Sequence, residues 1–586
     1  DKAQAHYLFG VMRQSVGASV LLFNGIDGEW RAEVAEAGKR GGVLACAEQT
    51  KPLQMPPDLW LIFAPIKKAR TDFIVEKAAE MGARRIVPVQ SEFTNAGRVQ
   101  RDRLQAHAVE AAEQGITIDG DSVKVLAERD PSRMAEVLNR VIEKAIRGSA
   151  PAQINVPRDY WTQVIDIELP QIVRLERPAG GAEAIAKAAN LLSKAKFPVI
   201  LSGAGVVIGN AIPECQALAE RLDAPVCSGY QHNDSFPGSH PLAAGPLGYN
   251  GSKAAMELIA MADVVLALGT RLNPFSTLPG YGIDYWPKSA SIIQVDINSD
   301  RIGLTKKLTV GICGDAKMVA NQILKKLSST AGDTDRDDRK AIIHQTKSAW
   351  MQTLTSMNHE DDDPGTNWNV EARKRDADFM SPRMAWRAIQ DGLPENAIIS
   401  SDIGNNCAIG NAYPTFEEGR KYLAPGLFGP CGYGFPSVLG AKIGCPDVPV
   451  VGFAGDGAFG ISMNEMTSCG RKEWPAITMV VFRNYQWGAE KRNSILWYDN
   501  NFVGTELDRT FSYAKAAKGF GLEGVLVKTQ SELTAALKES CKAQEDGVTT
   551  FIEVLLNQEL GEPFRRDAMK APVEVAGIDP KDMRQQ

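Results

Sequence analysis

The segment that most limits how this chain can fold is VVGFAGDGAFGISMNEM, residues 450–466. Its first half is a run of apolar residues that ends in Gly-Asp-Gly, and a helix-like pattern follows at once. A strand that passes through a glycine turn into a helix is the building unit of a parallel α/β sheet, and ligands bind beyond the carboxyl ends of such strands. The segment therefore predicts an α/β domain with a ligand site at the end of this strand.

The same alternation of apolar strands and helix-like stretches recurs along the 586 residues, which are too many for one hydrophobic core. FPVILSG, ADVVLALGT and SIIQVDIN are typical of buried parallel strands, as are AIISSDIG and ITMVVFRN further on. We therefore expect a multi-domain α/β protein with two parallel-sheet domains. The expected division is a small β-rich domain (1–55), a truncated α/β segment (56–114), a remnant of a further domain (115–170), a central α/β domain (183–330), a charged linker (331–379) and a last α/β domain (380–586).

Composition favours an ordinary soluble enzyme. The formal net charge is −6, which gives no reason to expect a nucleic-acid or membrane-surface partner for the whole chain. Nine cysteines are scattered singly, which favours buried thiols in a reducing compartment over a disulfide or zinc framework. The sequence shows no apolar run of membrane-spanning length and no signal-peptide pattern, and it lacks an initiator methionine, so we expect a cytoplasmic protein with a short piece missing.

Three features of the last region predict a metal and diphosphate site. Asp456 stands where a strand gives way to a helix, and a carboxylate there suits Mg²⁺, which takes one or two protein oxygens together with phosphate oxygens. Asn484 follows Gly457 after 26 residues, at the end of the next strand, and its amide oxygen and the backbone carbonyl of Gln486 would complete the protein ligands. SSDIGNNCAIG and GLFGPCGYGFPSVLGA add two further glycine-rich turns. A lone Gly-Asp-Gly is more often an ordinary turn, but the ordered set is far more specific.

This ordered set resembles the diphosphate-binding domain of the thiamine diphosphate enzymes. The resemblance implies that thiamine diphosphate and Mg²⁺ are bound, with Asp456, Asn484 and Gln486 as metal ligands. Two positions depart from the family pattern: Tyr485 replaces a second asparagine, and Cys431 stands where the family has a bulky apolar residue beneath the cofactor. The implied cofactor-binding residues are Gly404, Asn405, Asn406, Gly429, Pro430, Cys431, Gly432, Gly455, Asp456, Gly457, Ala458, Asn484 and Gln486.

A narrower resemblance covers about residues 128–586. SDIGNNCAIGNAYP, FRNYQWGAEKRN, GYQHNDSFPGSHPL and NQELGEPFRRDAMK are similar to the sulfoacetaldehyde acetyltransferase family. The resemblance implies a reaction of sulfoacetaldehyde with phosphate that yields acetyl phosphate and sulfite, in a homo-oligomer (a dimer or tetramer) with no membrane partner. The central domain resembles one that holds FAD in some relatives, but this subfamily does not need a flavin.

Sulfonate and phosphate groups require cations, and planar arginine donors match such oxyanions well. The candidates by residue type are Arg483, Lys491, Arg492, Arg565 and Arg566. For each of them the alternative is a solvated surface charge. His232 and His240 are candidates to shuttle protons or bind substrate, with a purely structural hydrogen bond as the alternative.

The front of the chain does not continue the same pattern. Thiamine diphosphate enzymes carry a pyrimidine-binding domain whose glutamate activates the cofactor, but no His-Glu-Gly sequence of that type occurs in the 586 residues, so no catalytic residue is assigned. Residues 115–170 match only the tail of that domain. The first 114 residues contain AQAHYLFGVMR, VLLFNGIDGEW, FAPIKKARTDFIVEKAAEMGARRIVPVQSEFT and RLQAHAVEAAEQ. These segments resemble the front half of the RsmE family of 16S rRNA methyltransferases, with a β-rich domain like the PUA fold at 1–55, which implies a chimera. A natural fusion and an error of assembly are both compatible with the sequence.

Three hypotheses follow. The first is a thiamine diphosphate-dependent acyltransferase of the sulfoacetaldehyde type, impaired because the pyrimidine-binding domain is missing. The second is an rRNA-binding or 16S rRNA uridine methyltransferase-like protein, with weak RNA contact through basic residues of the first 114. These residues are Lys67, Lys68, Arg70, Arg84 and Arg85. The third is a scaffold that binds the cofactor but is catalytically inactive.

Overall fold

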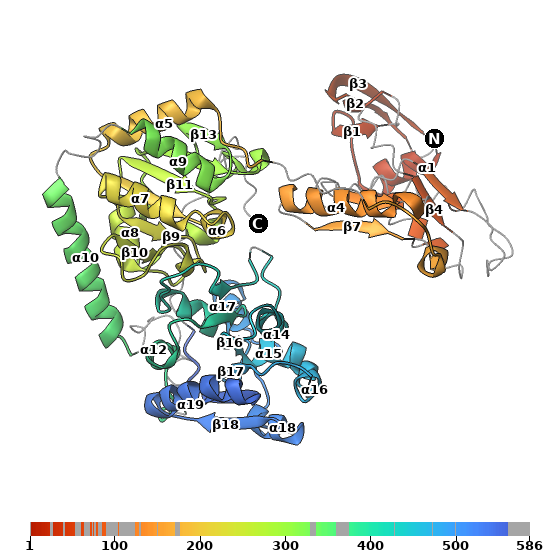
Figure 1. The fold of residues 1–586 in the computed structure, drawn as a ribbon. Coiled ribbons are helices and arrows are strands. Elements are labelled where there is room, and N and C mark those ends of the chain that lie inside the picture. The colour runs from red at the N-terminus through yellow and green to blue at the C-terminus, as the bar shows by residue number, and fades with distance from the viewer. Residues whose placement is uncertain are drawn as a thin grey trace. The chain divides into compact units, whose positions relative to one another are not determined.

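The structure is a computed structural model of the 586-residue chain, and its ribbon is shown in Figure 1. The chain divides into two compact units, residues 1–173 and 174–586. The structure describes residues 2–23, 27–38, 41–52, 60–63, 71–72, 74–75, 78–79, 85–88, 104, 124–127, 131–148, 151–156, 158–169, 176–327, 336–358, 374, 376–426, 428–471, 473–498 and 500–560.

The described residues of the first unit form three small sheets. An antiparallel sheet of order β1-β2-β3 pairs Ser19 with Glu33 and Glu29 with Lys51, which confirms the predicted β-rich start. β4 pairs with β5 and β6 with β7, both in parallel. The elements are α1 (Lys2–Ala5), η1 (His6–Val11), β1 (Ser19–Phe23), β2 (Glu29–Ala37), β3 (Gly42–Lys51), β4 (Trp60–Phe63), β5 (Arg85–Pro88), β6 (Lys124–Ala127), η2 (Pro131–Arg133), α4 (Met134–Gly148), β7 (Ala152–Asn155) and η3 (Arg158–Thr162).

The central part of the second unit is a six-stranded parallel sheet of order β10-β9-β8-β11-β12-β13. Every residue of β8 and β11 is buried, because helices cover both faces of a parallel sheet. The strands are β8 (Pro198–Ser202), β9 (Val226–Ser228), β10 (Ala243–Pro246), β11 (Val264–Leu268), β12 (Ser291–Asp296) and β13 (Val310–Cys313). The helices are α5 (Ala182–Lys194), α6 (Ala204–Ile208), α7 (Ile212–Leu222), η4 (Asn233–Ser235), α8 (Lys253–Ala260), η5 (Pro274–Ser276), η6 (Ser299–Arg301) and α9 (Ala316–Lys326).

The last part is a second six-stranded parallel sheet, of order β15-β14-β16-β17-β19-β18. The strands are β14 (Ile398–Ser401), β15 (Tyr422–Leu423), β16 (Val450–Gly455), β17 (Thr478–Arg483), β18 (Glu523–Val527) and β19 (Thr550–Leu555). The helices are α12 (Pro382–Gly392), α13 (Asn405–Ile409), η7 (Gly410–Ala412), α14 (Gly434–Gly444), α15 (Asp456–Ser462), η8 (Met463–Glu465), α16 (Met466–Cys469), α17 (Gly488–Trp497), α18 (Tyr513–Gly519), α19 (Gln530–Ala543) and η9 (Gln544–Asp546). The two parallel sheets confirm the predicted fold class.

Strand order in the last sheet creates a switch point. From β14 the chain runs to β15 on one side and then, through α14, to β16 on the other side. In open parallel sheets, connections that leave in opposite directions open a crevice at the carboxyl ends of the strands between them. The glycine turn after β14 and the Gly-Asp-Gly turn after β16 therefore meet at one crevice, with the end of β17 beside it.

The expected linker contains a long helix. Residues 336–356 form α10 (Arg336–Ser356), although the charged sequence around them suggested only a solvated connector. Ile343 packs in the central core, and Trp350 and Leu354 pack in the core of the last part. Ile342 and Met351 on the same helix are exposed, so the apolar residues give only a weak periodic signal and composition misled the prediction for this stretch. The exact domain limits stay a prediction.

All nine cysteines are free thiols. The expectation of buried thiols is wrong for four of them, because Cys46, Cys313, Cys431 and Cys445 are exposed. Cys431 is exposed at a cavity wall, as described below. In the described part of the chain, no helix is both long and apolar enough to cross a membrane.

Candidate active site

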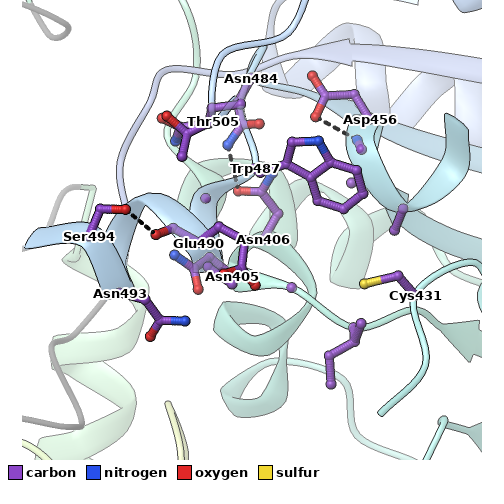
Figure 2. A pocket seen from close by; sticks show the side chains of 18 of the residues that line it. Asn405, Asn406, Cys431, Asp456, Asn484, Trp487, Glu490, Asn493, Ser494 and Thr505 are labelled. Atoms are coloured by element: carbon purple, nitrogen blue, oxygen red, sulfur yellow. Dashed lines mark hydrogen bonds between the residues drawn. The ribbon is translucent and has the colours of Figure 1, made fainter. Parts of the chain in front are cut away.

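A cavity of about 600 Å³ lies at the switch point of the last sheet (Figure 2). It is lined by the turns that follow β14, β16 and β17, together with the first turns of α17 and the segment 503–505. Of the thirteen residues that the sequence pattern selected, all except Pro430 and Gly432 line this cavity. The structure thus brings together four segments of the selected set, 404–406, 429–431, 455–458 and 484–486, whose first residues are up to 80 positions apart in the chain.

Asp456 is held in place by main-chain donors. It is the first residue of α15 and is 1% exposed; its Oδ1 accepts the N–H of Gly457 at 3.0 Å, and its Oδ2 accepts the N–H of Tyr485 at 2.6 Å. Burial raises the pKa of Asp456 to about 7, while these N–H groups and the Arg483 guanidinium oppose that rise. A carboxylate whose charge is this costly to bury is one that a bound cation stabilises.

Two amide side chains present buried oxygens to the same cavity. Asn484 follows β17, and its Nδ2 donates to Asn406 Oδ1 at 3.4 Å, which leaves its Oδ1 buried and without a hydrogen bond to any residue that the structure describes (Figure 2). The Oε1 of Gln486 is likewise buried and accepts no hydrogen bond from a described residue. A buried acceptor without a donor is unfavourable. A divalent cation, which accepts carboxylate and amide oxygens as ligands, would satisfy it.

The main chain at Gln486 is also arranged for ligation. Gln486 and Glu506 form an isolated antiparallel bridge. The two hydrogen bonds that close it come from the flanking residues: Leu507 N donates to Tyr485 O at 2.9 Å, and Trp487 N donates to Thr505 O at 2.8 Å. The carbonyl of Gln486 takes no part in this pair, which fits the predicted third protein ligand.

The backbone itself forms part of the cavity wall. Gly404 has φ +120°, and a Cβ there would meet no atom within 4 Å, so the backbone borders open space. A Cβ at Gly455 would also meet nothing within 4 Å. Gly457 differs, because its Cβ would come within 2.8 Å of the Trp487 ring. Glycine is therefore required at 404 by conformation and at 457 by the close approach of the Trp487 ring, while Gly404 and Gly455 leave room for a ligand.

Asp402 is a positioning residue that the sequence did not single out. It is fully buried; its Oδ1 accepts the N–H groups of Ile403 (2.8 Å) and Gly432 (3.1 Å), and its Oδ2 accepts that of Gly434 (2.7 Å). Burial raises the pKa of this carboxyl, and the three N–H donors oppose the shift. Asp402 thereby fastens the loop 429–434 to the end of β14. Its position directly after a buried strand was the available signal.

Trp487 is a second residue that the sequence did not select. Its ring lies against Gly457 and lines the cavity beside Cys431 and Asn406. The signal was an aromatic residue directly after the expected ligands, in NYQWG. Cys431 lines the cavity as an exposed thiol. The side chain at this position of the wall is therefore small, as the departure from the family pattern suggested.

The candidate substrate-binding cations occupy different environments in the structure. Arg483 is fully buried, with Nη1 3.5 Å from Asp456 Oδ2 and Nε 3.6 Å from Glu553 Oε1, and its guanidinium stacks on Tyr485 and Phe511. It balances buried carboxylates and does not line the cavity, so its assignment as a substrate cation is wrong. Lys491 is buried and ion-pairs with Glu506. Arg492 lines a second cavity. Arg565 and Arg566 lie outside the described residues.

The two histidines separate clearly. His240 lies between Glu220, whose Oε1 is 3.2 Å from its Nε2, and the N–H of Leu242, which donates to its Nδ1 at 3.1 Å. His240 therefore makes structural hydrogen bonds, which was the alternative to a role in proton transfer or substrate binding. His232 lines the second cavity, and burial, with a smaller effect of the Arg271 charge, lowers its pKa to about 4. His232 is therefore a neutral imidazole at pH 7.

Four of the five basic residues considered for RNA contact fall outside the described part of the first unit. Lys67, Lys68, Arg70 and Arg84 lie outside the described residues, and Arg85 begins β5. RNA contact stays a prediction.

Comparisons with known protein families agree with this division of the chain. Residues 185–326 match the thiamine pyrophosphate enzyme central domain, and residues 402–554 match the thiamine pyrophosphate enzyme C-terminal TPP binding domain. Residues 53–128 match an RNA methyltransferase domain, and residues 1–44 match an RNA methyltransferase PUA domain. The second unit is thus that of a thiamine diphosphate enzyme, preceded by segments of RNA methyltransferase type, and the chimera inferred from the sequence is confirmed.

Individual relatives narrow the class. The chain is 78% identical over 458 residues to a probable sulfoacetaldehyde acetyltransferase of Rhizobium meliloti, a match covering 78% of each protein. It is 75% identical to a sulfoacetaldehyde acetyltransferase of Roseovarius nubinhibens, covering 78% of this chain and 76% of the relative. A probable acetolactate synthase large subunit of Methanococcus aeolicus is 27% identical, covering 72% of this chain and 70% of the relative. The chain belongs to the sulfoacetaldehyde acetyltransferase family of thiamine diphosphate-dependent acyltransferases.

Proposed function

We propose that this chain binds thiamine diphosphate and Mg²⁺ in the 600 Å³ cavity and uses them for the acyl transfer of its family. The observation that carries the proposal is the buried, unsatisfied Oδ1 of Asn484 in one cavity with the buried carboxylate of Asp456. Asp456, Asn484 and the carbonyl of Gln486 would hold the metal. The residues that would contact the cofactor are Gly404, Asn405, Asn406, Gly429, Pro430, Cys431, Gly432, Gly455, Gly457 and Ala458 together with the metal ligands.

A magnesium site of this kind needs few protein ligands. Mg²⁺ usually keeps only one or two carboxylates and completes its shell with phosphate oxygens and water. Accordingly, the described residues contain no cluster of three or more His, Cys, Asp and Glu side chains suited to a metal. One carboxylate and one amide oxygen fit an ion that shares its remaining positions with a diphosphate.

The proposed substrates are sulfoacetaldehyde and phosphate. In the overall reaction the carbon–sulfur bond of sulfoacetaldehyde breaks and sulfite leaves, while the two-carbon unit becomes an acetyl group bonded to a phosphate oxygen. When bound, the cofactor supplies the carbanion stabilisation that this cleavage requires. The protein contributes position and charge: Asp456 and Asn484 fix the diphosphate end, and Asp402 holds the loop 429–434 against the cavity.

Further parts of the proposal concern assembly and location. Relatives of this type build each active site between two subunits, so we expect a homodimer or homotetramer of this chain in the cytoplasm. The family models at residues 1–44 and 53–128 are the support for an RNA contact of the first unit. They do not make RNA binding the main function, because 458 of the 586 residues align with the acetyltransferase relatives.

Calorimetry tests the proposal. Titration of thiamine diphosphate into the folded chain with excess Mg²⁺ is expected to give saturable binding of one cofactor per chain. We expect no binding when Mg²⁺ is replaced by a chelator, since the two ligand oxygens need the ion between them and the diphosphate. Thiamine without phosphates is the matched control and should not bind measurably. Equal binding of thiamine and thiamine diphosphate, or none by folded protein, would reject the proposal.

A further inference from the structure

A second cavity of about 280 Å³ adjoins the one described above. Gly404, Asn405 and Glu490 are among the residues that line both, so the two cavities border each other. Its far wall comes from the central domain, from the turns after β9 and β11. Carboxyl ends of strands from both sheets therefore contribute to one continuous space.

Hydrogen bonds between the two domains fix this wall. Asn233 Nδ2 donates to the carbonyls of Asn411 and Pro414, both at 2.8 Å. The N–H of Gln231 donates to Asn411 Oδ1 at 3.0 Å, and Asn411 Nδ2 donates to Tyr249 O at 3.2 Å. The residues that flank His232 on the chain are thus tied to the last domain by buried bonds, which give the second cavity a defined shape.

The second cavity is basic. Arg271 and Arg492 line it together with neutral His232 and the amide of Asn273. Glu490 is the one carboxylate among the described residues of the lining, and it is exposed to solvent. Two guanidinium groups and one exposed carboxylate thus line a space that burial partly shields from water.

Arg271 is the more informative of the two arginines. It follows β11 between Gly269, with φ +62°, and Leu272, with φ +53°, a conformation that a leucine rarely adopts. Leu272 is buried and its N–H donates to Thr270 Oγ1 at 3.2 Å, so the turn is locked in this unusual form. Backbone strain that the surroundings maintain is often associated with function.

No carboxylate among the described residues forms an ion pair with the Arg271 guanidinium. The guanidinium makes no hydrogen bond or ion pair with any residue in the described ranges. Burial, followed by the Arg301 charge, lowers the pKa of Arg271, and the Asp296 charge acts in the opposite direction. A half-buried arginine that forms no ion pair with a carboxylate of the described residues is suited to an external anion.

We propose that Arg271, assisted by Arg492, binds a tetrahedral oxyanion of the reaction beside the cofactor cavity. This rests on the function proposed above. Two sources share the chemistry: the phosphate that accepts the acetyl group, and the sulfonate of sulfoacetaldehyde. Arginine presents paired, planar N–H donors that match two oxygens of either group, and the cavity of about 280 Å³ has room for one such anion with water.

The test uses protein saturated with thiamine diphosphate and Mg²⁺, so that the diphosphate site cannot take up the anions. Inorganic phosphate and 2-hydroxyethanesulfonate, an unreactive sulfonate, are titrated separately at constant ionic strength. Arg271→Gln is expected to raise the Kd of one of them at least tenfold while the Kd of thiamine diphosphate stays within twofold. The anion that loses affinity identifies the source. The Kd of Arg271→Lys for that anion should lie between those of the wild type and Arg271→Gln, since lysine keeps the charge but loses the paired donors.

Arg301→Gln is the matched control, because it removes a nearby arginine charge that lines neither cavity. It should leave both anion affinities within twofold. Unchanged anion binding in Arg271→Gln, an equal loss in Arg301→Gln, or no binding of either anion by the loaded wild-type protein would overturn the inference. Failure of thiamine diphosphate itself to bind is a different result, and it would count against the proposed function instead.

Discussion

Asp456→Asn is expected to weaken the binding of thiamine diphosphate with Mg²⁺ by on the order of 100-fold or more, equivalent to roughly 2.7 kcal/mol. The asparagine keeps the shape and one acceptor, but it removes the single carboxylate that we propose for the metal shell. It also leaves Arg483, which lies between Asp456 and Glu553, with one buried counter-charge fewer. Calorimetric titration of the cofactor in excess Mg²⁺ measures the effect.

Asp447→Asn is the control for this variant, because Asp447 is exposed and lines neither cavity. Its cofactor affinity should equal that of the wild type. Circular dichroism establishes that both variants are folded. If Asp456→Asn and Asp447→Asn bind the cofactor equally well, Asp456 does not hold the metal.

The second large effect concerns turnover. A chain of the printed sequence is expected to release sulfite from sulfoacetaldehyde and phosphate about 10²–10⁴-fold more slowly than the Roseovarius nubinhibens relative. That range is what one positioned acid–base group contributes, and no His-Glu-Gly glutamate occurs in the 586 residues. Homo-oligomerisation does not supply it, because every copy has the same sequence.

The assay compares both proteins at saturating thiamine diphosphate, Mg²⁺ and phosphate. Because the proposed metal ligands Asp456, Asn484 and Gln486 are all present in this chain, it should still bind thiamine diphosphate in the same preparation. A turnover equal to that of the relative would show that another group of this chain performs the glutamate's role. A loss of both binding and turnover would instead count against the proposed site.

Much of the site could be predicted from local sequence. Asp456 and Asn484 directly follow apolar strands, and parallel strands bring such positions to one edge of the sheet. The glycine-rich turns that follow these strands could likewise be recognised from the local sequence. These are signals that depend on neighbours within a few residues, and the fold class followed from the repetition of the same pattern.

Other features depend on contacts that the sequence does not reveal. Arg483 was a plausible substrate cation by type, but its partner Glu553 stands 70 residues further along the chain, on the adjacent strand β19. Arg271 is a candidate anion ligand because it lines a cavity formed by the central and last domains together, which the sequence does not show. Asp402 accepts a hydrogen bond from Gly432, and the Trp487 ring lies against Gly457. Both contacts join residues about 30 positions apart in the chain. Charge and residue type alone do not distinguish these roles.

Diffraction from crystals grown with thiamine diphosphate and Mn²⁺ tests the central claim most directly, because Mn²⁺ replaces Mg²⁺ at oxygen sites and its anomalous signal locates the ion. The expected result is one ion in the 600 Å³ cavity, about 2.0–2.3 Å from an Asp456 carboxylate oxygen and from Asn484 Oδ1, with the cofactor diphosphate completing its shell. A cofactor bound in the cavity with its ion held by other residues, or an ion bound only outside the cavity, would contradict the account.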